Sequence, residues 1–247
     1  MKKNNINLIM HLHIFRYTQA IVLMLLIFLL SMTLFGSCTQ KNQELSDEYE
    51  HPGPPIIAVC FVPLDGVNTT DVKKLSEDFV SNFASKQCEP YFVQVLNASE
   101  IPDSCFNSIH TRYSAKKIIA FLENKYSKIA QKKAMANCSD DNWAFYVIGV
   151  TNRDISTQIH GKADYGILGL SYLNSLQINS SIISTYRLRR KKDLWKLATH
   201  EFCHGFYNAP HCSDEHCIMC DAKGGNPHFE IKDSLCAACA SFCLYGD

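Results

Sequence analysis

Apolar, β-rich runs alternate with segments of helical period along most of the chain. The apolar runs predict buried strands over residues 55–64, 90–96, 142–151 and 180–188. Between them, apolar side chains recur every three or four positions, which predicts helices over residues 69–85, 114–134 and 191–207. Thr70 is the expected N-cap of the first of these helices. Strands that alternate with helices predict an α/β domain with a mostly parallel sheet.

The N-terminal segment has the pattern of an export signal. A basic start is followed by the apolar run 20–36, whose length lies between that of a signal-peptide core and that of a membrane span. Gly36 and Ser37 stand directly before Cys38, which resembles the lipobox of bacterial lipoproteins, where the cysteine is acylated after cleavage. An uncleaved helical anchor is the alternative. Both interpretations predict an exported, membrane-tethered protein, in the periplasm or at the cell surface.

These features divide the chain into three parts. Residues 1–37 are the expected lipoprotein signal peptide, residues 38–55 are a polar tether, and residues 56–247 form the folded domain.

Hydrophobic residues make up 47% of the 247 positions, which is enough for a packed core. The formal net charge is zero, which disfavours a nucleic-acid partner because such proteins present a basic face. We expect a monomer.

The stretch THEFCHGFYNAPHC, residues 199–212, carries the first candidate chemistry. His200 and His204 lie four apart in a predicted helix, so both imidazoles face the same side and can bind one zinc ion. Glu201 stands beside them, where its carboxylate can take a proton from a metal-activated water. A catalytic zinc also needs a third protein ligand and an open fourth position.

His211 is the candidate third ligand. Asparagine is the non-glycine residue that best tolerates the left-handed conformation ending a helix, and Asn208 is followed by Pro210, which prevents the helix from resuming. The chain is therefore expected to turn at Asn208 and to return with His211 beside the first two histidines. In the alternative, His211 is a loop histidine, and His216 or an acidic residue binds the metal.

The cysteines downstream complete a longer pattern. HCSDEHCIMC, residues 211–220, is followed by LCAACASFC, residues 235–243. Together with HExxH, this order resembles the archaemetzincins, whose pattern is HExxHxxGxxHC, then C-x-M, then CxxC. The resemblance covers residues 200–239 and extends weakly upstream through IISTYRL, residues 182–188.

The departures from the family pattern lie in the turn and in one spacing. Tyr207 occupies the position of the glycine and Pro210 that of the third histidine, so His211 comes one residue later than in the family. The segment before Cys236 is one residue short. These differences concern the turn more than the ligand set.

The resemblance implies a metzincin-like α/β fold: a twisted mixed sheet, an active-site helix crossing it, and a zinc-stapled C-terminal part. It implies Glu201 as the general base and Met219 as the Met-turn, an apolar floor beneath the catalytic zinc. It also implies two zinc ions per chain, the catalytic one held by His200, His204 and His211 and the structural one by Cys212, Cys217, Cys236 and Cys239.

Spacing alone supports a competing set for the structural zinc, the zinc-ribbon pattern formed by Cys217, Cys220, Cys236 and Cys239. It differs from the implied set only in Cys220 for Cys212. The implied set is favoured because Cys220 directly follows Met219, whose backbone the Met-turn should hold under the catalytic site. Structural disulfides are the third interpretation, since the twelve cysteines of an exported chain are expected to be paired or bound to metal.

The expected function is that of a zinc metallopeptidase in which Glu201 activates a water for attack on a peptide bond. The archaemetzincin family is associated with aminopeptidase-like activity, although the sequence offers no identified ligand for a free amine. The alternative function is a catalytically inactive, zinc-structured binding module at the cell surface. A further alternative keeps the metal but uses Glu230 as an acidic ligand, in the manner of gluzincins. The expected partner is a peptide or protein substrate.

Overall fold

A computed structural model describes most of the chain after its N-terminal segment, namely residues 56–107, 109, 111–135, 143–159, 161–172, 179–221 and 229–245. The signal peptide, the tether and the acylated Cys38 fall outside the described residues and remain predictions. Within the described ranges, no helix is both long enough and apolar enough to cross a membrane.

The main sheet has five strands in the order β2-β1-β4-β8-β7. Their bounds are Ile56–Pro63 for β1, Tyr91–Val95 for β2, Trp143–Thr151 for β4, Gly169–Tyr172 for β7 and Asn179–Ser184 for β8. The strands β2, β1, β4 and β8 are mutually parallel, whereas β7 pairs antiparallel to β8 at the edge. The prediction of a mostly parallel sheet is therefore confirmed, with one antiparallel strand added.

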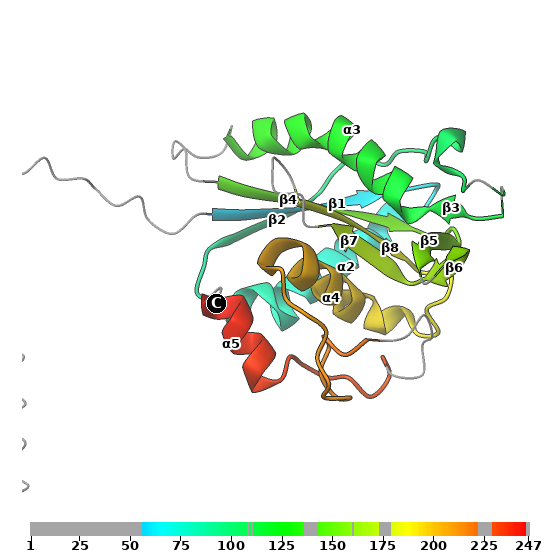
Figure 1. Cartoon of the computed structure of the whole chain (residues 1–247). Coiled ribbons are helices and arrows are strands. Elements are labelled where there is room, and N and C mark those ends of the chain that lie inside the picture. The colour runs from blue at the N-terminus through cyan, green and yellow to red at the C-terminus, as the bar shows by residue number, and fades with distance from the viewer. Residues whose placement is uncertain are drawn as a thin grey trace, which may run out of the picture. The chain divides into compact units, whose positions relative to one another are not determined.

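Helices cover both faces of this sheet (Figure 1). The α-helices are α2 (Thr69–Asn82), α3 (Ala115–Met135), α4 (Leu194–Tyr207) and α5 (Ala237–Tyr245), with short 3-10 turns at Ala84–Lys86, Asp103–Cys105 and Lys191–Asp193. Helix α3 packs on one face, and α2 and α4 pack on the other. Burial on both faces explains why β1 is an almost unbroken apolar run.

A second, smaller sheet contacts α3 and was not predicted. It consists of β3 (Tyr113–Ser114), β5 (Ile155–Ile159) and β6 (Lys162–Ile167), in the order β3-β5-β6. The hairpin of β5 and β6 is antiparallel and largely exposed at its tip. Its polar residues and its bulge hide the alternation by which a strand is recognised.

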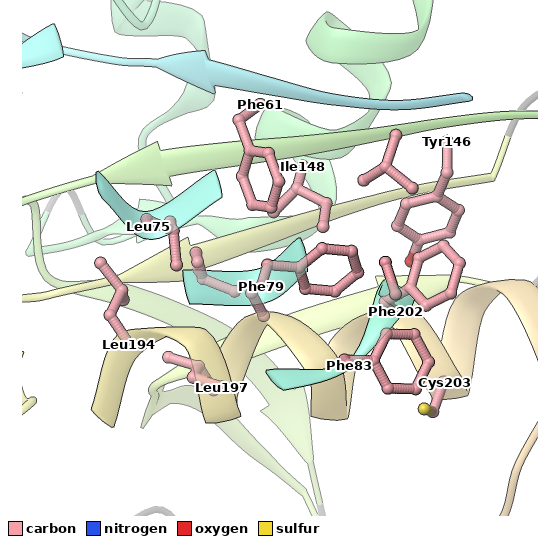
Figure 2. Close-up of a cluster of buried hydrophobic side chains, with 14 of the residues drawn as sticks. Phe61, Leu75, Phe79, Phe83, Tyr146, Ile148, Leu194, Leu197, Phe202 and Cys203 are labelled. Carbon is pink, nitrogen blue, oxygen red and sulfur yellow. The ribbon is translucent and has the colours of Figure 1, made fainter. Parts of the chain in front are cut away.

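Aromatic side chains hold α4 against the sheet (Figure 2). Phe202 of α4 meets Tyr146 of β4 edge to face, with ring centroids 4.9 Å apart, and meets Phe79 of α2 at 5.7 Å. Phe79 in turn meets Phe61 of β1 at 5.6 Å. All four side chains are buried. Because such packed aromatic pairs stabilise beyond their buried area, they fix the position of α4 relative to the sheet.

Two local predictions were wrong in detail. The N-cap of α2 is Asn68 rather than Thr70, since the Asn68 side chain accepts a hydrogen bond from the Thr70 backbone N–H at 2.8 Å. The strand predicted to reach residue 188 ends at Ser184. Beyond it the chain turns, because Arg187 leaves the strand direction to bind the Asp154 carboxylate through Nε at 2.7 Å and through a terminal nitrogen at 2.8 Å.

Candidate metal centre

Two histidines project from one face of α4. His200 and His204 are one helical turn apart, and their Nε2 atoms lie 3.0 Å from each other. Nδ1 of His200 donates to the carbonyl oxygen of Ile218 at 2.7 Å, and Nδ1 of His204 donates to that of Ala209 at 2.6 Å. Because each ring carries its proton at Nδ1, the Nε2 lone pairs are available to a metal.

The turn after α4 brings a third histidine to the same place. Asn208 ends the helix with φ 56° and ψ 29°, in the left-handed region, and its backbone N–H bonds the carbonyl oxygen of Cys203. The predicted turn at Asn208 is confirmed. One candidate ligand nitrogen from each of His200, His204 and His211 lies within 4.8 Å of the others.

Burial keeps the first two imidazoles neutral. Desolvation lowers the pKa of His200 well below its usual value, and the neighbouring His204 lowers it further. Desolvation is also the main reason that the pKa of His204 is lowered. Because a protonated imidazole cannot bind a metal, these lowered pKa values extend metal binding toward acidic pH.

The Glu201 carboxylate lines the same site, and only 6% of the residue is exposed. Ser171 of β7 donates its hydroxyl to Oε2 of Glu201 at 2.9 Å. Burial raises the pKa of Glu201 to about 8, and the hydrogen bond from Ser171 opposes that rise. A buried carboxylate of raised pKa beside three imidazoles is a candidate general base.

Four thiols form a second cluster in the C-terminal part. The sulfur atoms of this cluster lie within 4.8 Å of one another and belong to Cys212, Cys217, Cys236 and Cys239. The backbone N–H of Cys239 holds the pKa of Cys236 below the usual thiol value, which favours a thiolate there. The structure thus gathers Cys212 into the cluster and leaves Cys220 outside it.

One short segment joins the two clusters. The backbone N–H of Cys212 donates to the carbonyl oxygen of Met219 at 2.9 Å, and Met219 is fully buried. The preceding residue, Ile218, holds the His200 ring through its carbonyl oxygen. The position implied for a Met-turn therefore lies directly between the imidazole cluster and the thiol cluster.

The residues that were considered as substitute ligands lie elsewhere. Glu230 faces Arg190, with 4.0 Å between a carboxylate oxygen and Nε. The imidazole of His216 is exposed and faces the carbonyl oxygen of Ile231 at 3.3 Å. Neither side chain joins the imidazole cluster. None of the four clustered cysteines is in a disulfide, so disulfides do not explain the thiol cluster.

A cleft of about 800 Å³ opens over the imidazoles, a size typical of ligand sites. The strand β7 and the β5–β6 hairpin form one wall, and α4 with the turn after it forms the other. Apolar residues such as Ile167, Leu197 and Phe229 line its inner part. Among the described residues, Lys162 and Asp221 also line it and add one charged side chain of each sign besides Glu201.

Known structures share this arrangement of elements. No protein-family model matches the chain, and no curated protein matches it in sequence. Archaemetzincin from Archaeoglobus fulgidus, solved in complex with malonate, is 23% identical, with 75% of this chain and 99% of that one covered and a TM-score of 0.55. Archaemetzincin from Methanopyrus kandleri is 16% identical, with 75% and 92% covered and a TM-score of 0.54. A zinc-dependent peptidase from Methanocorpusculum labreanum is 17% identical, with 74% and 98% covered and a TM-score of 0.56.

The chain has the archaemetzincin fold. The metzincin-like α/β architecture that the sequence motif implied is confirmed, with a mixed sheet and α4 packed across it. The thiol cluster occupies the C-terminal part of this archaemetzincin fold, where the family pattern implied a structural zinc site.

The longer helix explains the additional residue before His211. Helix α4 continues through Tyr207, which stands where the family pattern has its glycine, and Asn208 then makes the left-handed turn. Tyr207 is held in the helix by its hydroxyl, which lies 2.5 Å from that of Tyr91 on β2. The turn is thus displaced by one residue, and His211 still reaches the other imidazoles.

Two glycines of the site were missed in the sequence because their role is visible only in three dimensions. Tyr146 donates its hydroxyl to the Glu201 carbonyl oxygen at 3.1 Å, and a Cβ on Gly205 would collide with that hydroxyl. A Cβ on Gly169 of β7 would lie 2.5 Å from Oε1 of Glu201. Ser171 was missed for the same reason, since it is 30 residues from Glu201 in sequence.

Replacing Asn208 tests the turn. Asn208→Val is expected to lower the free energy of unfolding by about 2 kcal/mol, because a β-branched residue resists positive φ. Asn208→Gly is the matched control and should change it by less than about 1 kcal/mol, since glycine adopts this conformation freely. Denaturant unfolding measures both. Equal stability of the two variants would contradict the role of the left-handed turn.

Proposed function

We propose that this protein is a zinc-dependent peptidase with Glu201 as its general base. The proposal rests on the convergence of three imidazole nitrogens beside a buried carboxylate, in the wall of a cleft. The archaemetzincin fold supports it, since one neighbour with this fold is described as a zinc-dependent peptidase.

The donor atoms fit zinc at both clusters. Zinc–sulfur bonds of about 2.3 Å in a tetrahedron place the sulfurs about 3.8 Å apart, and Sγ of Cys212 lies 3.8 Å from Sγ of Cys236. Zinc–imidazole bonds of about 2.0–2.1 Å place two nitrogens about 3.4 Å apart, which is close to the 3.0 Å between the Nε2 atoms of His200 and His204. Two unprotonated nitrogens at this distance favour a shared cation.

The two clusters would hold their ions in different ways. His200, His204 and His211 supply three neutral ligands and leave one position open to the cleft, as catalytic zinc sites do. Cys212, Cys217, Cys236 and Cys239 complete a four-coordinate shell, as structural sites do. We therefore propose two zinc ions per chain.

Each side chain of the site has a task in peptide hydrolysis. Zinc, when bound, supplies a Lewis acid that acidifies water and polarises a carbonyl oxygen. Glu201 takes the proton from the attacking water and passes it to the leaving amine. The carbonyl oxygens of Ile218 and Ala209 keep His200 and His204 in the tautomer that binds through Nε2. The apolar inner part of the cleft excludes water around the reacting groups.

Metal removal and replacement test the proposed function. The purified full chain should contain two zinc equivalents by elemental analysis and should cleave a mixture of fluorogenic peptides. A chelator such as 1,10-phenanthroline should stop the cleavage, and added zinc should restore it. Absence of zinc from the purified protein would overturn the proposal, as would full cleavage by metal-free protein. Two bound zincs without cleavage would favour the inactive binding module.

The same assay decides between aminopeptidase and endopeptidase action. Asp221 is a carboxylate in the cleft that could accept a free amine, and no other described acidic residue besides Glu201 lines it. Aminopeptidase action requires that peptides with a free N-terminus be cleaved and that their acetylated counterparts be left intact. Equal cleavage of both forms would assign endopeptidase action instead.

A further inference from the structure

The edge strand β7 contacts the Glu201 carboxylate at two alternate positions. Ser171 donates its hydroxyl to Oε2 at 2.9 Å. Gly169 lies two residues earlier and so presents the same face of the strand. A Cβ on Gly169 would lie 2.5 Å from Oε1 and 2.8 Å from both Cδ and Cγ of Glu201. The Glu201 carboxylate thus packs against the strand at Gly169, where no Cβ intervenes, and accepts a hydrogen bond from the Ser171 side chain.

We propose that Ser171 is a positioning residue that fixes one oxygen of Glu201 so that the other is presented to the cleft. The inference deepens the proposed peptidase function and rests on it for its catalytic consequence. Ser171 itself touches no reacting atom in this scheme. It acts through Glu201, whose carboxylate must lie within hydrogen-bonding distance of the attacking water.

The hydrogen bonding of the carboxylate is unequal between its two oxygens. Among the described residues, the side-chain donor to the Glu201 carboxylate is the Ser171 hydroxyl, and it reaches Oε2 alone. Without that hydroxyl, Oε2 would be a buried acceptor lacking its partner, which destabilises the observed orientation. Rotation about the Cγ–Cδ bond is easy for a carboxylate, so a hydrogen bond to one oxygen fixes the plane of the group and thereby the direction of the second oxygen.

Both partners of this contact belong to well-held elements. On β7, Gly169 pairs with Ile183 and Ser171 pairs with Ser181 of β8. On α4, the Glu201 backbone is held by the Tyr146 hydroxyl. A hydrogen bond between two fixed elements constrains geometry more closely than one from a loop. The hydrogen bond from Ser171 therefore fixes the orientation of the Glu201 carboxylate in addition to supplying a partner for its buried oxygen.

The test compares Ser171→Ala with Ser171→Thr. Loss of the hydroxyl should lower kcat for a fluorogenic peptide by roughly ten- to a hundredfold, the range for one hydrogen bond to a charged group. The zinc content should stay unchanged, because Ser171 is not among the candidate metal ligands, and kcat should fall more than KM changes. Ser171→Thr keeps the hydroxyl and should restore most of kcat. Ser180→Ala is the matched control, since it removes a buried hydroxyl of β8 that bonds Glu123 and not Glu201.

Two further readouts separate this inference from the proposed function. Crystal structures should show one carboxylate orientation in the parent and in Ser171→Thr, and several in Ser171→Ala. Affinity for acetohydroxamate, a zinc-binding probe that also hydrogen-bonds the base, should fall about tenfold in Ser171→Ala. If the parent cleaves no peptide, the peptidase proposal fails, and these two readouts still judge the positioning role.

Three results would overturn the positioning role. The first is an unchanged kcat and unchanged hydroxamate affinity in Ser171→Ala. The second is loss of zinc together with activity in that variant, which would make Ser171 a structural residue. The third is a single, unmoved carboxylate orientation without the hydroxyl. If Ser171→Ala does not fold, Gly169→Ala displaces the same carboxylate from the other contact and should lower kcat at constant zinc content.

Discussion

Glu201→Ala should abolish peptide hydrolysis while both zinc equivalents remain bound. The Glu201 carboxylate is placed to accept a proton, whereas the three imidazoles and the four thiols supply the candidate metal ligands without it. Loss of a general base typically lowers the rate by about a hundred- to ten-thousandfold. Single-turnover cleavage of a fluorogenic peptide, alongside elemental analysis of zinc, measures both parts of the expectation.

Glu201→Gln is the control for the side-chain volume that Glu201→Ala removes. Glutamine fills the same space over Gly169 and can still accept the hydrogen bond from Ser171, but it cannot take a proton from water. It should therefore be as inactive as Glu201→Ala and more stable. If either variant cleaved the parent's substrate at the parent's rate, the general base would have to be another residue.

Cys212→Ala should remove one zinc equivalent and destabilise the C-terminal part. A four-thiolate zinc supplies much of the folding free energy of small zinc domains, about 10–16 kcal/mol in isolated zinc fingers. Here most of the buried core is formed by the main sheet with α2, α3 and α4, so we expect a loss of several kcal/mol and a lower Tm. Zinc affinity at the imidazoles should also fall, since Cys212 adjoins His211 and its N–H bonds the Met219 carbonyl oxygen.

Cys220→Ala is the matched control for that variant. The Cys220 thiol is half-buried, is next to Met219 in sequence, and lies outside the thiol cluster. Its replacement should leave two zinc equivalents and change the Tm little. The opposite result, with zinc lost from Cys220→Ala and kept in Cys212→Ala, would establish the zinc-ribbon set in place of the one that the structure gathers.

The parts of the fold that the sequence predicted are those with a strong one-dimensional signal. The strand β1 is a continuous apolar run, and α3 has a helical period along its length, so both were located to within a residue or two. The strand β7 has four residues and no clear period, and it is a strand only because β8 lies beside it. The sequence reading recognised only the cysteines of α5, since the residues of this helix are almost all apolar or small and show no helical period.

The candidate site divides in the same way. HExxH places His200, Glu201 and His204 by local geometry, because one helical turn determines their relation. Ser171 and the choice between Cys212 and Cys220 depend on which distant segments meet, and spacing along the chain does not encode that. Asn208 is an intermediate case, where residue type alone indicated the left-handed turn that the structure has.

The candidate metal ligands of the cleft lie away from the crevice in which α/β proteins usually bind their ligands. In the parallel order β2-β1-β4, the β1–β2 connection through α2 and the β2–β4 connection through α3 lie on opposite faces, and doubly wound proteins bind ligands at the carboxyl ends of the strands where this reversal occurs. A hollow of about 520 Å³ lies there, between the ends of β1 and β4 and the start of α2. The imidazoles lie instead beside the antiparallel strand β7, which forms one edge of the sheet. A ligand search based on topology alone would therefore begin between β1 and β4. The candidate metal ligands of this chain lie elsewhere, beside the edge strand β7.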